Sequence, residues 1–435
     1  MKVFHKGSSK NNIADTNKTF YFHYAWVIVA IIAGMQMVGA SVRMAFGVFI
    51  EPMSEGFGWS HGSITLSYAI SHVISALASP WAGRFGDKHG ARRAMFLGCG
   101  LFVVGMILTG MATELWQIYA SFGILIGISE ALFLVPLIPS AMIWFRRHLG
   151  WGMGVLMLGW GLGPAVSAPL MGFMIERLGW QWTFWVTAGV SSIIMAPMIY
   201  FFRNKPSDMG LLPYGAIKND GPEIVANLDK DKVRVFTKYI SKTSAYWNMS
   251  SIHFLGCVGH AVILVYLIPI ALHEGISLVV AASLLTVMSG VSIVTRLATP
   301  VLADKHGPKL VMFCFYFIQG VTVLMLFGAH ETYVFYLFAV SFGIGYGGET
   351  GGFPILNRKY YGYAPVGSAH GFQMLGAGLG MALGGWIGGV LFDIYGTYDI
   401  ALAVSVLSSI AGALSILLLE STNKLLIPDW ETSQA

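Results

Sequence analysis

The chain has 435 residues, of which 55% are hydrophobic and only 11% are charged, whereas a soluble domain carries about 25% charged residues. A soluble core of this size could not bury so many apolar side chains, so we predict a membrane protein with lipid as its second solvent. The formal charge of +5 is small, and no nucleic-acid-binding motif accompanies it, which argues against a nucleic-acid partner.

Apolar runs of helix length divide the chain into twelve predicted membrane-spanning helices. A polar segment, 1–23, predicted as an N-terminal tail, precedes them. A longer polar segment, 203–245, predicted as a central loop, separates two groups of six. The predicted fold class is an all-α membrane protein with two six-helix halves, 24–202 and 246–420, and a tail, 421–435. The twelve predicted spans are 24–49, 61–82, 94–112, 116–144, 150–174, 181–202, 246–271, 278–302, 309–328, 333–357, 367–391 and 397–419.

Basic residues are distributed very unevenly between the two sets of loops. The N-terminal segment, the loops after even-numbered spans and the C-terminal tail hold 23 of the 26 Lys and Arg residues. The opposite loops hold a single basic residue, Arg177, together with several Asp and Glu residues. The positive-inside rule therefore predicts a multi-pass protein of a cytoplasmic (inner) membrane with both termini in the cytoplasm.

The tetrapeptide DKHG occurs twice, beginning at Asp87 and at Asp304. Each copy follows the second predicted span of its half, on the side of the membrane that carries the basic loops. Such a repeat indicates an internal duplication in which the two loops occupy corresponding positions.

The sequence gives no sign of catalysis. No loop carries a nucleophile with a base or a metal constellation, so we predict that the protein is not an enzyme and uses no cofactor. Cys99, Cys257 and Cys314 all lie in apolar spans without metal-ligand spacing, and we interpret them as small apolar fillers. We accordingly assign no metal site.

The first DKHG segment lies within a longer family signature, G-x-x-x-D-[RK]-x-G-x-[RK]-[RK], which in the major facilitator superfamily follows the second helix. The matching residues are Gly83, Asp87, Lys88, Gly90, Arg92 and Arg93, and the degenerate second copy includes Asp304 and Lys305. Together with the topology and the repeat, this motif resembles that superfamily over almost the whole chain. More narrowly, the chain is similar to the oxalate/formate antiporter and monocarboxylate transporter branch, through segments 55–71, 159–163 and 203–215 and through Arg296.

The resemblance implies that the signature residues form a conformational latch. Asp87 would lie near helix N-termini and cytoplasmic Arg side chains, where its charge is stabilised only in the outward-facing state. Breaking that contact would let the halves rock against each other. The alternative is that these charges only enforce the topology.

Four charged residues lie well inside the predicted spans: Arg43, Glu130, Arg296 and Glu349. Because a charge at the centre of a bilayer costs about 2.5–3.5 kcal/mol on insertion scales, each of them requires a partner or a function. The four residues could neutralise one another in pairs, or they could line a charged cavity for an ionic substrate.

Arg296 lies eight residues before Asp304, about 12 Å from the cytoplasmic end of its helix. In the carboxylate-transporting branch an arginine on this helix binds the substrate carboxylate, so the resemblance implies this role for Arg296. The alternative is a structural ion pair with Glu349. Arg43 is a second candidate anchor or a partner of Glu130, and Tyr68 and Tyr346 complete the candidate substrate-binding residues.

Glu130 and Glu349 occupy corresponding helices of the two halves and are candidates for proton coupling. Burial favours the neutral form of a carboxylate and a neighbouring Arg favours the charged form, so substrate bound to that Arg could control protonation. Histidine titrates near neutral pH, which makes His260 a further candidate. For His253 and His72 we favour simple hydrogen bonding between helices.

We therefore predict a secondary active transporter of a small organic anion, most plausibly a monocarboxylate, that works by alternating access with proton symport. Partners are the anion, protons and the lipid bilayer, and a monomer is sufficient. Organic-anion exchange and drug or metabolite efflux are the alternatives. Two departures bear on them: the oxalate type carries a lysine where Ala377 stands, and the efflux signature after Gly163-Pro164 is incomplete.

Overall fold

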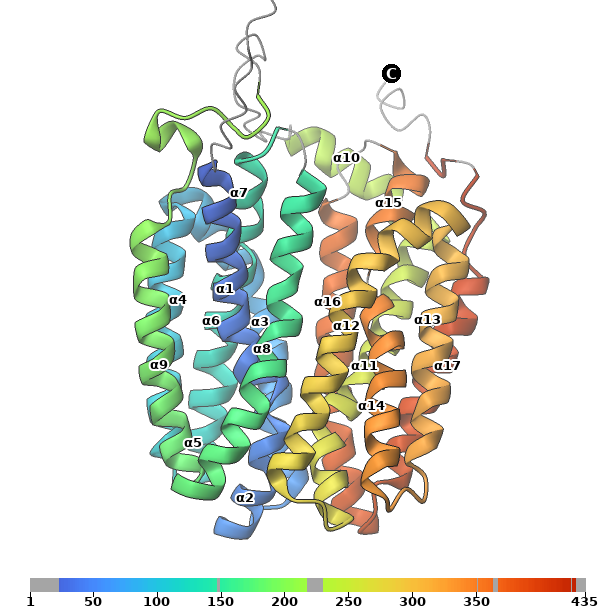
Figure 1. Cartoon of the computed structure of the whole chain (residues 1–435). Coiled ribbons are helices and arrows are strands. Elements are labelled where there is room, and N and C mark those ends of the chain that lie inside the picture. Colours follow the sequence, from blue (N-terminus) through green and yellow to red (C-terminus); the bar gives the residue numbers. More distant parts are fainter. Residues whose placement is uncertain are drawn as a thin grey trace, which may run out of the picture.

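The computed structural model describes residues 23–146, 149–216, 230–349, 351–362, 367–423 and 425–427. In these ranges nearly the whole chain is helical, and the long helices run side by side in one bundle (Figure 1). In the first half they are α1 (Tyr24–Met44), α2 (Gly47–Phe57), α3 (His61–His89), α4 (Ala91–Gly110), α5 (Leu115–Ile118), a π-helix (Tyr119–Ile126), α6 (Gly127–Leu134), α7 (Leu137–Ile143), α8 (Leu149–Leu178) and α9 (Trp180–Phe201).

The second half begins after the central segment. A short 3-10 turn (Pro206–Met209) and α10 (Lys230–Ile240) lie between the halves in sequence. The remaining helices are α11 (Ser244–His273), α12 (Leu278–His306), α13 (Pro308–Val323), a 3-10 turn (Leu324–Leu326), α14 (Thr332–Gly348), α15 (Phe353–Tyr361), α16 (Gly367–Tyr395) and α17 (Asp399–Leu417).

All twelve predicted spans correspond to helical segments, which confirms the predicted fold class. Within the described residues, ten helical segments are long and apolar enough to cross a membrane by length and composition alone. The other two spans are α3, which carries Arg84, Asp87 and Lys88 in its last turns, and the tenth span, which is split into α14 and α15 near Glu349. The apolar part of α3 is rich in Ser and His, which lowers its mean hydropathy, and α14 has only 17 residues before the break.

Three spans are interrupted rather than continuous. The first span breaks between α1 and α2, the fourth between α6 and α7, and the tenth between α14 and α15. In the fourth span a π-helix precedes α6, and π-helical turns occur often at functional sites. Interrupted membrane helices leave backbone groups without helical partners, and such breaks are tolerated where protein or a cavity surrounds them.

The repeated DKHG segments are helical, which corrects their prediction as loops. Asp87 and Asp304 lie on the last turns of α3 and α12, and only the glycine of each copy ends the helix. Gly90 and Gly307 adopt φ of 87° and 89°, a conformation that favours glycine because it has no Cβ. The same ending in both halves is what an internal duplication requires.

The central segment predicted as a loop also contains a helix, α10. Its sequence is polar overall, but Val233, Phe236 and Ile240 recur at a helical spacing. Phe236 and Ile240 are fully buried in a cluster with residues of the second half, including Ile416 and Leu419. This amphipathic spacing is the feature of the sequence that favours a helix at α10.

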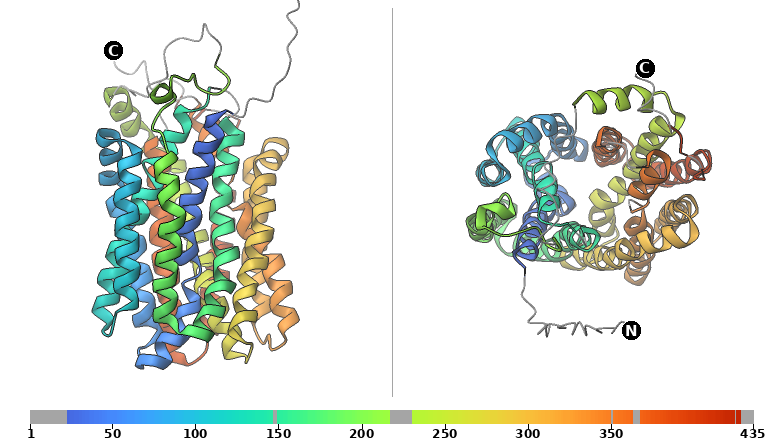
Figure 2. Two further views of the ribbon diagram at one scale, coloured as in Figure 1. Left: turned by 60° about the vertical axis from the view of Figure 1, so that its left-hand side comes forward. Right: turned by 90° about the horizontal axis from the view of Figure 1, so that it is seen from above.

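The two halves pack side by side, with α3 against α16, α8 against α12 and α2 against α11 (Figure 2). We call the two ends of the bundle the α10 end and the α2 end, after the helices that lie there (Figure 1). The first residues of α1 and the last of α17 lie at the α10 end.

Contact between α16 and α3 weakens from the α2 end towards the α10 end. A Cβ placed on Gly389 would lie 2.8 Å from the backbone nitrogen of Gly62, and one on Gly385 would lie 2.4 Å from the ring of Tyr68. A Cβ on Gly378 would lie 3.6 Å from Ala76, and one on Gly371 would meet nothing within 4 Å. The halves are therefore closely packed along these helices at the α2 end and separated at the α10 end.

A carboxylate joins the halves at the closed α2 end. Asp393 of α16 accepts hydrogen bonds from the backbone nitrogens of His61 (2.9 Å) and Gly62 (2.7 Å) at the start of α3. The imidazole of His61 contacts Tyr398 (3.0 Å) and Glu51 (3.2 Å), and its hydrogen bond holds the pKa of Glu51 below the usual value. A carboxylate at a helix N-terminus also interacts favourably with the helix dipole.

We expect Asp393→Ala to shift the protein towards a state that is open at the α2 end. Because the carboxylate is partly solvated, its two hydrogen bonds should favour closure by about 1–2 kcal/mol, a factor of about 5–30 in population. Spin labels on the exposed residues Glu114 and Glu331, one in each half at this end, should report a larger population at long distance. The control is Asp399→Ala, also exposed at this end of α17, and equal distance distributions in the two variants would contradict the prediction.

Candidate functional site

A buried ion pair lies at the break of the first span. Arg43, on the last turn of α1, lies with its Nη1 atom 3.6 Å from Oε2 of Glu130 on α6, and both side chains are nearly inaccessible to solvent. Gly39 makes room for the carboxylate, because a Cβ there would lie 2.5 Å from Oε1 of Glu130. The structure thus shows the Arg43–Glu130 contact that the sequence offered as one alternative.

His72 of α3 completes this cluster. Its Nδ1 atom lies 2.7 Å from Nη2 of Arg43, and the imidazole is buried. A guanidinium only donates hydrogen bonds, so this contact requires a neutral imidazole that accepts with Nδ1. Arg43 Nε and Glu130 Oε1 have no hydrogen-bond partner among the described residues. The cluster can therefore still donate a hydrogen bond from Arg43 Nε and accept one at Glu130 Oε1.

The second half holds a corresponding acidic residue with a different partner. Glu349 follows α14 directly at the break of the tenth span and is fully buried. Its Oε2 atom lies 2.8 Å from Nδ1 of His260 on α11, whose Nε2 lies 3.0 Å from the sulfur of Met381. The alternative ion pair between Arg296 and Glu349 is absent from the described residues, because the carboxylate pairs with His260.

Arg296 of α12 is held by an aromatic ring instead of a carboxylate. Its guanidinium carbon lies 4.8 Å from the centre of the Tyr346 ring, and the arginine is half-buried. Its Nε atom has no hydrogen-bond partner, and no Asp or Glu among the described residues forms an ion pair with it. The side chain also makes a hydrogen bond to Tyr346. A planar guanidinium that has no carboxylate partner is a group that can bind a carboxylate bidentately.

Two tyrosines bring the clusters of the two halves together. Tyr346 packs edge-on against His260 at 5.1 Å, and Tyr68 lies 4.5 Å from the ring of His72. Tyr68 and Tyr346 are close enough to interact electrostatically, as are His72 and His260. The Tyr68 hydroxyl is buried without a hydrogen-bond partner among the described residues. The candidate substrate and proton residues of both halves therefore gather around one region between them.

The signature residues lie away from this region, at the α10 end. Asp87, Lys88 and Arg93 are exposed, and no hydrogen bond or ion pair joins Asp87 to another described residue. Arg92 instead donates from Nε to the carbonyl of Ile199 and from Nη2 to that of Tyr200, at the end of α9. Asp304 and Lys305 are exposed on α12, and Gly83 packs near Val135.

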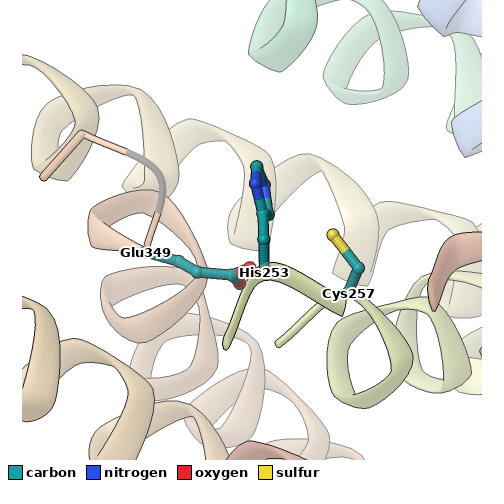
Figure 3. Close-up of side chains that lie close together, drawn as sticks. All are labelled: His253, Cys257 and Glu349. Carbon is teal, nitrogen blue, oxygen red and sulfur yellow. The ribbon is translucent and has the colours of Figure 1, made fainter. Parts of the chain in front are cut away.

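One cluster of potential ligands was missed by the sequence analysis. His253, Cys257 and Glu349 are all buried, and their ligand atoms lie within 4.8 Å of one another (Figure 3). The spacing of four between His253 and Cys257 on one helix was a signal. The third residue could not be foreseen, because Glu349 comes from a distant segment.

Comparison with known proteins supports the architecture. The model of the Major Facilitator Superfamily matches residues 29–358 and 249–432. Monocarboxylate transporter 12-B of Danio rerio is 24% identical over 423 residues, covering 90% of this chain and 86% of that protein. The oxalate:formate antiporter of Oxalobacter formigenes is 24% identical over 409 residues, covering 92% and 91%.

A fungal relative gives the same picture. The MFS-type transporter opdF of Penicillium oxalicum is 24% identical over 365 residues, covering 82% of this chain and 81% of that protein. These similarities match the branch that the sequence motifs indicated. With a family match along nearly the whole chain and an all-helical, membrane-spanning bundle of two repeated halves, the protein belongs to the Major Facilitator Superfamily.

Proposed function

We propose that this protein transports a small organic anion, a monocarboxylate, by alternating access between its two halves. The observation that carries the proposal is Arg296, a half-buried guanidinium that stacks on Tyr346 and has no carboxylate partner among the described residues. Names of similar proteins agree with this substrate class, since they refer to monocarboxylates and to oxalate and formate.

One free cation favours a single carboxylate over a dicarboxylate. Arg43 is already paired with Glu130, and the sequence of α16 contains no Lys or Arg. A substrate with two carboxylates would have to break the Arg43–Glu130 pair to find its second cation. A monocarboxylate can bind Arg296 first without that cost, and would engage Arg43 only in a later step in which Glu130 takes up a proton.

Proton coupling follows from competition for Arg43. When a bound anion takes over the Arg43 guanidinium, the Glu130 carboxylate loses its cation in a buried position, where the protonated form is more stable. Anion and proton would then be carried together. We place the proton site at Glu130, because its partner Arg43 is the cation that an anion can take over.

The orientation of the protein completes the proposal. The described basic loops gather at the α10 end, and following the positive-inside rule we propose that this end and both termini lie in the cytoplasm. The conformation described above, closed at the α2 end and separated at the α10 end, is then inward-facing. Exposure of Asp87 agrees with a latch that engages only in the outward-facing state.

Gradient-driven uptake into proteoliposomes tests the proposed coupling. We expect an inside-alkaline pH gradient to drive accumulation of a radiolabelled monocarboxylate, because each anion enters with a proton. Glu130→Gln should abolish this accumulation and keep anion exchange at equal pH, since glutamine fills the site but does not titrate. Glu114→Gln, an exposed residue at the α2 end, is the matched control.

The results of this experiment distinguish proton symport from anion exchange and from drug or metabolite efflux. Exchange that ignores the gradient in the wild type would favour an organic-anion exchanger. Absence of flux for every carboxylate, with flux of apolar compounds, would favour efflux and overturn the proposal.

A further inference from the structure

The cluster of His253, Cys257 and Glu349 has the composition of a transition-metal site. His253 and Cys257 are one helical turn apart on α11, and Glu349 approaches them from the break between α14 and α15 (Figure 3). One nitrogen, one sulfur and one carboxylate oxygen lie within 4.8 Å of one another in a fully buried position. These three groups are typical ligands of zinc-type ions.

Two of the candidate ligand groups carry polar atoms without a hydrogen bond in the described structure, although the Glu349 carboxylate also interacts with Tyr316 and His260. Nδ1 of His253 and Oε1 of Glu349 are buried without a hydrogen-bond partner. Buried polar atoms nearly always have a partner, so two unsatisfied ligand atoms beside a thiol need an explanation. A shared ion would satisfy both of them at once.

Neighbouring side chains fix the orientation of two ligands. The His253 imidazole stacks on Phe353 at 4.4 Å with an angle of 16°, which holds the ring plane. His260 binds the other carboxylate oxygen of Glu349 at 2.8 Å, which leaves Oε1 directed away from it. Partners that orient the ligands in this way are a regular feature of metal sites.

We propose that His253, Cys257 and Glu349 bind one divalent transition-metal ion of the Zn²⁺ class. Binding forms three bonds from the metal, to nitrogen, sulfur and oxygen, and releases the thiol proton of Cys257 to solvent. The +2 charge is then balanced by one thiolate and one carboxylate, which suits an apolar surrounding. Mg²⁺ and Ca²⁺ are disfavoured because they prefer oxygen ligands alone.

The proposed site has consequences for coordination and motion. Zinc lies about 2.0 Å from nitrogen and about 2.3 Å from sulfur, so the ligand atoms must draw closer than they stand here. Three protein ligands leave a fourth position for water or an anion. A bound ion would also tie α11 to the break in the tenth span, so we expect it to slow transport by restricting that hinge.

Cobalt binding tests the site directly, because Co²⁺ replaces Zn²⁺ and is coloured. Purified full-length protein carrying no polyhistidine tag is titrated with Co²⁺, and then with Zn²⁺ in competition. We expect one ion per chain and a near-ultraviolet thiolate-to-cobalt band. Cys257→Ser should remove the band, and His253→Ala should weaken binding at least tenfold. A double variant, Cys99→Ser with Cys314→Ser, should keep both the thiolate-to-cobalt band and the affinity for Co²⁺.

A second readout separates loss of binding from loss of folding. Zn²⁺ should raise the melting temperature of the wild type and of the Cys99/Cys314 double variant, and should leave that of Cys257→Ser unchanged. A cobalt band that persists in Cys257→Ser, or cobalt binding that neither Cys257→Ser nor His253→Ala affects, would overturn the site. Neither readout depends on transport, so the proposed metal site and the proposed anion transport can be disproved independently of each other.

Discussion

Arg296→Ala is expected to reduce monocarboxylate transport to the background level of empty liposomes. The proposed binding uses two hydrogen bonds from the Arg296 guanidinium to the substrate carboxylate. Hydrogen bonds to charged groups contribute about 1.5–3 kcal/mol each, so the loss of even one of them weakens anion binding by about ten- to a hundredfold. The side chain has no ion-pair partner among the described residues, so its removal leaves no buried carboxylate uncompensated. The variant should therefore fold normally and fail specifically in substrate binding.

Counterflow of a labelled carboxylate and the melting temperature should be measured on the same preparation. Arg296→Lys should keep part of the activity, because a lysine retains the charge and loses the planar fork and the stacking on Tyr346. Arg177→Ala is the matched control, since Arg177 lies over Phe173 at the opposite end of the molecule from the basic loops. Full transport by Arg296→Ala would remove the basis of the proposed function.

Arg43→Met is expected to cause the largest loss of stability among substitutions of the buried charges. Removing one partner of a buried ion pair costs about 3–5 kcal/mol, because the remaining charge is left without compensation. Arg43 has two partners, Glu130 and His72, and the variant strips the carboxylate of its cation. We expect a melting temperature several degrees lower in detergent.

The double variant Arg43→Met with Glu130→Gln should recover most of that stability, since no charge then remains in the cluster. Glu130→Gln alone leaves Arg43 with only the His72 imidazole and should be intermediate. If the two single effects simply added in the double variant, Arg43 and Glu130 would not be energetically coupled. That result would also remove the competition on which the proposed proton coupling rests.

The two arginines inside the membrane-spanning helices, Arg296 and Arg43, differ in their partners. Arg296 is stacked and unpaired, whereas Arg43 is paired and buried. Both lie where helices of one half approach the other half, close to the tyrosines Tyr68 and Tyr346.

Architecture was predictable because its causes are local in the sequence. A bilayer of fixed thickness requires apolar runs of helix length, and the loops between them carry the orientation signal in their charge. The duplication was visible in DKHG, and Gly90 and Gly307 end their helices with the same backbone conformation. The prediction was wrong for α10 and for the ends of α3 and α12. In these segments polar residues led to the prediction of a loop, although the segments are helical.

Partner choice inside the membrane was decided only by the tertiary structure. Helical periodicity predicts on which side of its own helix a charged residue lies. It does not predict which other helix packs against that side. Arg43 meets His72 across 29 positions of sequence, and Glu349 meets His260 across 89. The sequence by itself therefore determined that four charges inside the spans needed partners or a function. Packing of the helices determined that three of them are paired and that Arg296 lies against Tyr346 without an ion-pair partner among the described residues.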